Sequence, residues 1–296
     1  MAFFMNKRSL TILIGTESYY PTISGVAVFS RQLALELIKR GHCVHVICPS
    51  TRFSSYSEVD EGIKVHRIRA IKNPFRGATK ISLLPRGQVM KWFNEIKPDV
   101  VHMQDPTSIC SELIRMCNIT QTKCVITNHF AFEYVLSYLP WLKFSHKLIA
   151  RLLEKYLIKM YNRCDFVTFP SDTIRQHFGY QKLKAPSQTI SNGVNLDQFF
   201  PSFNFEELKA HFHLPNKPLI LHLGRLDQDK KVGLILDAFA KVKQNYDAHL
   251  IIGGEGNRKK RLLKKARQCG LEKDITFIGF MHHQTELPQL YQMATV

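Results

Sequence analysis

The segment Leu223–Lys231, LGRLDQDKK, brings two carboxylates and three cations close together in the sequence. Asp227 and Asp229 have the spacing of a carboxylate pair that could bind a divalent metal, because such ions prefer oxygen ligands. Arg225 and Lys230 could instead bind an anionic group. The neighbouring cations would repel a metal ion and pair with both carboxylates, so we expect no metal site here. The segment therefore favours an anion-binding role for Arg225 and Lys230.

A helix is expected to begin close to this segment. Apolar side chains recur at helical spacing at Val232, Ile235, Leu236, Phe239 and Val242. Lys230 and Lys231 then lie at the positive end of the helix dipole, which disfavours cations. Two interpretations stay open: Asp227 and Asp229 cap the helix, or an anion bound by Arg225, Lys230 and the helix amides completes the site.

Two further candidates follow apolar segments that are typical of buried strands. Ser24-Gly25 opens a helix after a strand that ends near Gly15, and His129 follows a strand that ends near Asn128. In doubly wound sheets the ligand crevice lies at the carboxyl ends of the strands. Gly25 would let an anion approach the helix amides, or Ser24 simply caps the helix. His129 is either a structural hydrogen-bonding group or part of the crevice.

A glycine-rich turn and a basic run complete the set of short motifs. Gly253, Gly254 and Gly256 follow a strand and predict a tight turn near a ligand. The basic run from Arg258 to Arg267 is most simply a solvated helix face. No G-x-G-x-x-G motif occurs, which argues against a nicotinamide or flavin site.

Residues 139–163 predict an amphipathic helix with a basic row. Its cations recur every four residues, at Lys143, Lys147, Arg151, Lys155, Lys159 and Arg163. Its apolar side consists of Trp141, Leu142, Phe144, Leu148, Leu152 and Leu153. Such a helix can lie on an anionic membrane surface, or dock on its own domain and present the basic row outward. These two interpretations are compatible.

The composition is that of a globular protein attracted to phosphate. The chain has 296 residues, enough for two domains, with 45% hydrophobic residues and a net charge of +17. The positive charge would attract phosphate groups in nucleic acid, in lipid or in a small molecule. No apolar run is long enough for a transmembrane helix, and the first residues lack the pattern of a signal peptide, so we expect a cytoplasmic protein. Seven scattered cysteines without C-x-x-C predict neither a zinc site nor a disulfide framework.

Strand and helix signals alternate along the chain, which predicts an α/β fold with parallel sheets. Strands are expected at residues 10–14, 44–48, 100–103, 124–128, 165–170, 219–224, 248–254 and 275–280. A segment rich in Pro, Asn and Ser separates two doubly wound domains, at residues 1–190 and 217–296, with a linker at 191–216. The second domain is expected to be incomplete, with a further strand beginning in the final YQMATV.

These motifs together resemble the family-four retaining glycosyltransferases of GT-B fold. The resemblance rests on YYPTISGVAVFSRQLALELIKRGHCVHVI, ISNGVNLDQFFP, LHLGRLDQDKKVGLILDAF and IIGGEGNRKKRLLKKARQCGLEKDITFIGF, and it covers nearly the whole chain. It implies two Rossmann-like domains facing a cleft, the first on the acceptor side and the second binding a nucleotide-diphosphate sugar. The family needs no metal, and the nucleotide sugar is its donor substrate, so we expect no cofactor.

The resemblance also assigns roles to individual residues. Arg225 and Lys230 match the positions that hold the diphosphate, Gly25 the loop beneath it, and His129 a histidine near the reacting carbon of the sugar. Gly254 and Glu255 match the turn that flanks the nucleotide. The family's loop often carries a glycine pair where this chain has Ser24-Gly25, which is a mild departure.

The segment TNHF…YLPWL resembles the subgroup that glycosylates membrane lipids such as diacylglycerol. This predicts a lipid or glycan acceptor and a peripheral position on the inner face of the cell membrane. The family's E-x7-E element is expected shortly after LYQMATV, so we expect a truncated chain that is inactive or poorly soluble as it stands. The alternative to an enzyme is a non-catalytic basic module that binds anionic membrane or nucleic acid, although no nucleic-acid motif is present. An epimerase on the same fold would need acid and base residues that the sequence does not reveal.

Overall fold

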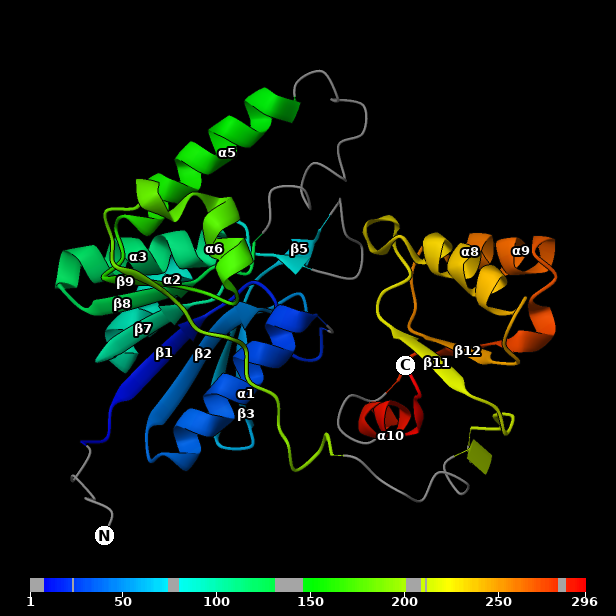
Figure 1. Ribbon diagram of the computed structural model, residues 1–296. Helices are drawn as coiled ribbons and strands as arrows, with labels where there is room; N and C mark the ends of the chain where they lie inside the picture. The colour runs from blue at the N-terminus through cyan, green and yellow to red at the C-terminus, as the bar shows by residue number, and fades with distance from the viewer. Residues whose placement is uncertain are drawn as a thin grey trace, which may run out of the picture. The chain divides into compact units, whose positions relative to one another are not determined.

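The structure is a computed structural model that describes residues 8–22, 24–73, 80–130, 146–200, 209–210, 212–281 and 286–296. The chain forms two compact units, Met1–Asn192 and Gly193–Val296. Both units consist of parallel strands connected by helices, as Figure 1 shows. The expected α/β class of both units is confirmed.

The first unit is built on one eight-stranded sheet with the order β10-β9-β8-β7-β1-β2-β4-β3. Its strands are β1 (Thr11–Gly15), β2 (Cys43–Pro49), β3 (Tyr56–Asp60), β4 (Ile63–Ile68), β7 (Val100–Met103), β8 (Lys123–Thr127), β9 (Phe166–Phe169) and β10 (Ser187–Thr189). All neighbouring strands are parallel except β3 and β4, which form an antiparallel pair at one edge. A separate short pair consists of β5 (Ile71–Lys72) and β6 (Lys80–Ile81).

Helices cover both faces of this sheet, which explains why its strands are apolar on both sides. On one face α1 (Gly25–Lys39) packs through Ala34 against Ile12 and Ile14 of β1. On the other face α2 (Arg86–Ile96) and α3 (Ser108–Thr120) share a core with Leu13. The same core includes residues from α5 (His146–Tyr161) and α6 (Asp172–Phe178), and a 3-10 turn, Tyr180–Lys182, follows α6.

The second unit has a parallel three-stranded sheet with the order β11-β12-β13. Its elements are β11 (Leu219–Leu223), the 3-10 turn η3 (Gln228–Lys230), α8 (Val232–Val242), β12 (His249–Gly253), α9 (Lys259–Gln268), the 3-10 turn η4 (Glu272–Asp274), β13 (Ile275–Gly279) and α10 (Glu286–Met293). The helices α8 and α9 pack on one face of the sheet around Leu250, whereas α10 packs on the other around Ile251 (Figure 1).

The eight expected strands all form, but two expectations about the sheets need correction. The hairpin β3–β4 was not expected and adds an antiparallel edge to the otherwise parallel first sheet. The last residues do not begin a strand at Tyr291, because that residue lies in α10. Only beyond the helix does the backbone extend along β11, where Thr295 donates to the carbonyl of Leu219 and Val296 accepts from Leu221. In the described ranges, no helix combines the length and the apolar character that a membrane span needs.

Candidate functional site

In the first unit three neighbouring strands end at the same edge of the sheet. The strands β8, β7 and β1 are adjacent and parallel, so the residues that follow them lie side by side. These residues are Thr16 and Glu17 after β1, Gln104 and Asp105 after β7, and Asn128 and His129 after β8. They form a polar cluster, which we call the strand-exit cluster.

His129 is a neutral, hydrogen-bonded member of this cluster. Its Nε2 lies 3.2 Å from Oε1 of Gln104, and its ring meets the edge of Phe29 of α1 with 4.9 Å between centroids. Burial lowers the pKa of His129 to about 4, so the imidazole is uncharged at neutral pH. His129 can therefore act by hydrogen bonding, and it carries no positive charge with which to attract an anion.

A second histidine lies beneath the cluster and behaves in the same way. His102 of β7 is hydrogen-bonded through Nε2 to Oγ1 of Thr127, at 2.7 Å. Burial, followed by the proximity of His129, lowers the pKa of His102 to about 4. The two imidazoles thus form a neutral polar layer under the carboxyl ends of β7 and β8.

The strand-exit cluster also contains a carboxyl pair that the sequence analysis missed. Asp105 accepts from the backbone N–H of Glu17 at 2.6 Å, from the hydroxyl of Thr16 at 3.1 Å and from the hydroxyl of Thr107. Glu17 Oε1 accepts from the backbone N–H of Ser82 at 2.5 Å. Glu17 Oε2 is buried and has no hydrogen-bond partner in the part of the chain that the structure describes.

The environment of Glu17 stabilises its protonated form. Burial, and then the negative charge of Asp105, raises the pKa of Glu17 to about 7. Burial also raises the pKa of Asp105, against the opposing effect of its hydrogen bonds. Both residues directly follow apolar strands, so extending the argument used for His129 to β1 and β7 would have found them.

The loop from β1 to α1 confirms the capping interpretation of Ser24. Its Oγ accepts from the backbone N–H of Ala27 at 3.1 Å and lies 2.6 Å from the hydroxyl of Ser18. Gly25 is exposed, and a Cβ atom at this position would meet none of the described residues within 4 Å. Packing therefore does not require a glycine, and the role of Gly25 beneath a diphosphate stays a prediction.

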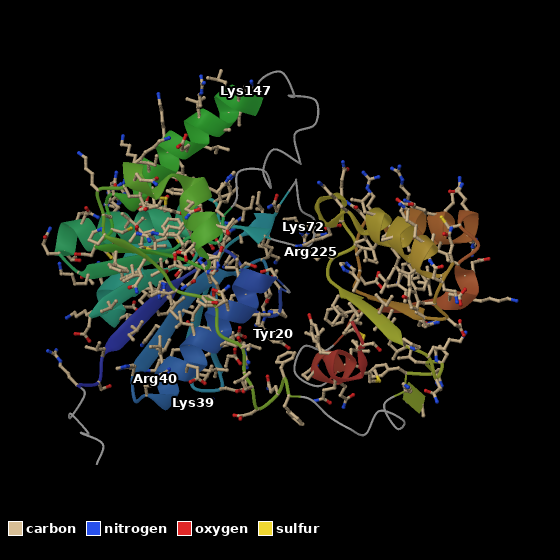
Figure 2. All side chains as sticks on the ribbon, in the orientation of Figure 1. Tyr20, Lys39, Arg40, Lys72, Lys147 and Arg225 are labelled. Carbon is tan, nitrogen blue, oxygen red and sulfur yellow. The ribbon has the colours of Figure 1, made fainter. Side chains whose placement is uncertain are left out.

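In the second unit Arg225 and Asp227 pair within the loop that follows β11, where Figure 2 labels Arg225. Asp227 accepts from Nη1 of Arg225 through Oδ2 and from the backbone N–H of Asn257 through Oδ1, at 3.2 Å. Asp227 therefore does not cap α8, and that interpretation is wrong. The helix begins at Val232, after an N-cap residue, Lys231, that makes no side-chain capping bond. The side chain of Asp229 lies outside the described residues.

Lys230 ends the 3-10 turn η3 just before α8. Its side chain is exposed, and its charge contributes, after burial, to lowering the pKa of the neighbouring His222. Arg225, held by Asp227, and Lys230 thus present two cations on the loop between β11 and α8. The first turn of α8 contains no acidic residue. This loop can bind an anion by the combined action of cations and helix amides.

The predicted glycine turn brings the ends of all three strands of the second unit together. Gly254 has φ +131°, and a Cβ atom there would overlap the carbonyl oxygen of Gly224. Its N–H donates to the carbonyl of Gly279 at 2.6 Å. Gly256 is equally constrained, because a Cβ atom would lie 2.5 Å from the backbone of Leu226. Glycine at both positions is thus required by close backbone approach.

Glu255 contributes its backbone and its side chain to different contacts. Its carbonyl accepts from the N–H of Leu226 at 3.0 Å, which ties the glycine turn to the Arg225 loop. Its carboxylate is half exposed and lies 2.5 Å from Nζ of Lys259. Within the described ranges no group of three His, Cys, Asp or Glu side chains could hold a metal ion.

The basic row of residues 139–163 falls partly on α5. Lys147, which Figure 2 labels, is exposed, as are Arg151, Lys155, Lys159 and Arg163. Leu148 and Leu152 beside the row are 60% and 57% exposed, whereas Leu157 and Tyr161 near the end of the helix are buried in the core. The helix therefore docks through its C-terminal half and presents the row outward. Lys143, Trp141, Leu142 and Phe144 lie outside the described residues.

Two family models match successive parts of the chain. Residues 23–198 match the model described as Glycosyltransferase Family 4, and residues 204–296 match the model described as Glycosyl transferases group 1. The chain is 24% identical over 275 residues to the alpha-monoglucosyldiacylglycerol synthase of Streptococcus pneumoniae, covering 90% of this chain and 60% of that protein. The synthase of the same name from Acholeplasma laidlawii is 24% identical over 97% of this chain and 73% of its own length.

Another relative and two solved structures are also glycosyltransferases or share their fold. The GDP-mannose-dependent alpha-(1-6)-phosphatidylinositol dimannoside mannosyltransferase of Mycobacterium tuberculosis is 26% identical, over 94% of this chain and 70% of its own. Sucrose-phosphate synthase from Thermosynechococcus elongatus superposes with a TM-score of 0.70 at 17% identity, covering 97% of this chain and 74% of that one. Anabaena HepE, solved with UDP and glucose, superposes with a TM-score of 0.68 at 17% identity, covering 96% and 72%. The fold is therefore that of the GT-B glycosyltransferases.

Proposed function

Because the chain belongs to glycosyltransferase family 4, we propose that it transfers a hexose from a nucleotide-diphosphate sugar to an acceptor with retention of the anomeric configuration. The observation that carries this proposal is the cationic loop between β11 and α8. There Arg225 is oriented by Asp227, and Lys230 precedes a helix whose first turn has no acidic residue. A departing nucleoside diphosphate develops negative charge, which such preorganised donors stabilise.

In this mechanism Arg225 and Lys230 bind the diphosphate and stabilise it as it leaves the sugar. The guanidinium of Arg225 can bind two phosphate oxygens at once, and Lys230 adds a point charge. Glu255 and Gly254 flank the nucleotide, and Gly25 leaves room beneath the diphosphate. No metal or other cofactor is required, because the cations supply the positive charge.

The proposed role of His129 follows from its neutral state. An uncharged imidazole can hydrogen-bond a sugar hydroxyl near the reacting carbon without pairing with the phosphates. Its contact with Gln104 and its packing against Phe29 fix the ring in place before the substrate arrives. His129 is therefore proposed as a catalytic residue that positions the donor sugar.

The proposed acceptor is a membrane lipid. Three observations support this choice: two relatives are named for glucosylating diacylglycerol, another for a phosphatidylinositol dimannoside, and α5 presents exposed leucines beside exposed cations. The protein would then act as a peripheral enzyme on the anionic inner face of the cell membrane. Nucleic acid is not proposed as a partner.

Isothermal titration of the chain with a panel of UDP- and GDP-sugars tests the donor site. We expect one nucleotide sugar to bind, and Arg225→Ala and Lys230→Ala each to weaken it by about tenfold or more, the loss of one charge-assisted contact. Lys260→Ala, which removes an exposed cation from α9, is the matched control and should change the affinity less than about twofold. Absence of binding to every nucleotide sugar, or equal effects of all three variants, would contradict the proposal. NMR of the glycoside that the chain forms from that nucleotide sugar then reports the anomeric configuration.

A further inference from the structure

A pocket of about 300 Å³ lies between the N-terminal ends of α8 and α9 in the second unit. Its volume is at the lower end of the range for small-molecule sites. Four cationic residues line it, Lys231, Arg258, Arg261 and Lys265, over an apolar floor that includes Val232 and Leu262. The pocket is thus distinct from the diphosphate-binding groups of the proposed function, Arg225 and Lys230, which are not part of its lining.

The cations of this pocket are poorly neutralised. Lys265 lies 2.5 Å from Asp237 and also donates to the carbonyl of Gly233. Arg258 donates to the side-chain amide oxygen of Gln228, which is uncharged. Lys231, Arg258 and Arg261 make no ion pair with any residue whose side chain the structure describes. Three cationic residues of the lining therefore have no carboxylate partner among the side chains that the structure describes.

Asp227 is the acidic residue in the lining, and it does not neutralise these cations. Its two carboxylate oxygens already accept from Arg225 and from the backbone N–H of Asn257. The net formal charge of the lining is consequently positive even when Asp227 is counted. An anion in the pocket would meet cations and helix amides before it met a carboxylate.

The two helix ends add to the positive potential. Neither α8 nor α9 has an acidic residue in its first turn, and α9 instead begins with Lys259, Lys260 and Arg261. The N-terminus of a helix carries partial positive charge and unpaired N–H groups, so cations there are unfavourable unless an anion is present. Val232 and Gly233, whose N–H groups belong to the first turn of α8, line the pocket directly.

We propose that the pocket between α8 and α9 binds a phosphate monoester or diester, held by Lys231, Arg258 and Arg261 together with the first-turn amides of α8. Phosphate offers several acceptor oxygens, which match converging guanidinium, ammonium and N–H donors. The site uses cations other than Arg225 and Lys230, but it shares Asp227 and the first turn of α8 with the loop proposed to bind the donor. Its ligand can be a soluble phosphate ester or the headgroup of a phospholipid, and the chemistry of recognition is the same for both.

The test uses the full chain with Arg225→Ala and Lys230→Ala, so that phosphate cannot bind at the proposed donor site. Binding of sn-glycerol 3-phosphate is followed by 31P NMR line broadening. We expect saturable binding in this background, weakened by about tenfold or more when Lys231→Gln and Arg261→Gln are added. The matched control is Lys260→Gln with Lys264→Gln, which removes two exposed cations of α9 outside the pocket and should weaken binding less than about twofold.

A second arm identifies the source of the phosphate. The same variants are tested for flotation with phosphatidylcholine vesicles with and without phosphatidylglycerol. Preferential loss of phosphatidylglycerol binding in the Lys231→Gln, Arg261→Gln variant supports a lipid headgroup, whereas loss of glycerol 3-phosphate binding alone supports a soluble ester. Equal effects of pocket and control variants, or no binding in either arm, would overturn the inference. Because no nucleotide is used, neither result depends on the proposed donor activity.

Discussion

Glu17 lies in an environment that separates its behaviour from that of an ordinary surface carboxylate. One oxygen accepts from Ser82, the other is buried, and the carboxylate of Asp105 lies close by. The protonated form is favoured because ionisation would place a second negative charge in a site with low dielectric constant. Glu17 also joins the loop after β1 to Ser82, which directly follows β6.

We predict that Glu17→Gln stabilises the protein in alkaline but not in acidic solution. The pKa of Glu17 is about 7 in the folded chain and ordinarily 4.5, so its contribution to stability is lost as the pH rises through 7. Glutamine keeps an oxygen for Ser82 and cannot ionise. The variant should gain about 1–3 kcal/mol over the wild type at pH 8.5 and little at pH 5, in urea unfolding followed by fluorescence.

Glu95→Gln serves as the control, because Glu95 is an exposed carboxylate on α2 that lies 4.0 Å from Lys91. Its effect on the free energy of unfolding should be within about 0.5 kcal/mol at both pH values. A Glu17→Gln effect that is the same at pH 5 and pH 8.5 would show that the pKa of Glu17 is not raised in the folded state.

At the scale of elements, the glycine turn between β12 and α9 depends on backbone contact between loops. Gly254 lies against Gly224, and Gly256 lies against Leu226, so the loops after β11 and β12 touch without intervening side chains. The N–H of Leu226 and the carbonyl of Glu255 add a hydrogen bond between these loops. This contact fixes the backbone from which Arg225 projects.

Gly254→Ala is predicted to destabilise the second unit by about 3–5 kcal/mol, since a methyl group would combine backbone strain with a steric overlap. Gly270→Ala isolates the strain alone, because Gly270 has φ +68° and a Cβ atom there would meet no atom of the part of the chain that the structure describes within 4 Å; it should cost about 1 kcal/mol. Hydrogen exchange of the β11–β13 amides measures the loss of stability in each of the two variants. Similar protection in the two variants would contradict the predicted role of the close approach.

The helix α5 is the element best suited to meet a membrane. Its N-terminal half extends away from the sheet of the first unit (Figure 1), and it exposes Leu148, Leu152 and a row of cations. Apolar side chains next to cations suit the boundary between acyl chains and anionic headgroups. The buried residues of its C-terminal half anchor the helix to the core.

Changing Lys147, Arg151 and Lys155 together to glutamine is predicted to weaken binding to phosphatidylglycerol vesicles. At about 1 kcal/mol for each cation near an anionic surface, the expected loss is on the order of 100-fold. The charge-matched control replaces Lys91, Lys97 and Lys184 of the same unit by glutamine and should show less than about a fifth of that loss in free energy. Vesicle flotation measures the membrane affinity of the α5 variant and of the control variant. Equal losses of affinity would show that the binding depends on net charge alone.

At the scale of the whole molecule, buried histidines make the fold sensitive to acid. Burial is the main cause that lowers the pKa of His45, His66, His102 and His129 to about 4. All four belong to the first unit, and the rings of His45 and His66 are stacked within it. An unfolded chain binds protons at these positions with an ordinary pKa of about 6.5.

The first unit is therefore predicted to lose about 2 kcal/mol or more of stability between pH 7 and pH 5. The folded pKa values are depressed, so below pH 6.5 the unfolded chain binds more protons and the stability falls as the pH falls toward 4. Glu17 acts in the opposite direction over the same range and reduces the net loss. Urea unfolding monitored by tryptophan fluorescence follows this unit, because Trp92 packs on the ring of His66.

The pH dependence should become weaker in His102→Gln, since glutamine keeps a partner for Thr127 without titrating. A free energy of unfolding that is unchanged between pH 7 and pH 5 would contradict the neutral state of these imidazoles. It would also remove the basis for treating His129 as an uncharged group in the proposed mechanism.

Local sequence patterns were enough to predict eight of the strands and several of the polar residues that follow them. Apolar β-branched runs such as Thr11–Gly15 and His249–Gly253 are specified by local hydrophobicity, and the carboxyl ends of parallel strands follow from them. His129, Arg225 and Lys230 were identified in this way. The hairpin β3–β4 was missed, because its partly exposed first strand carries few apolar residues.

Interactions between residues distant in the sequence became apparent only from the three-dimensional fold. Asp227 pairs with Arg225, as the neighbouring charges indicated, but its other oxygen accepts from the backbone of Asn257, 30 positions away, instead of capping a helix, because two loops meet there. The pKa of Glu17 is raised first by burial and then by the charge of Asp105, which lies 88 positions away along the chain. Charge pairing, desolvation and close backbone approach are set by three-dimensional proximity, and no local pattern of residue types encodes that proximity.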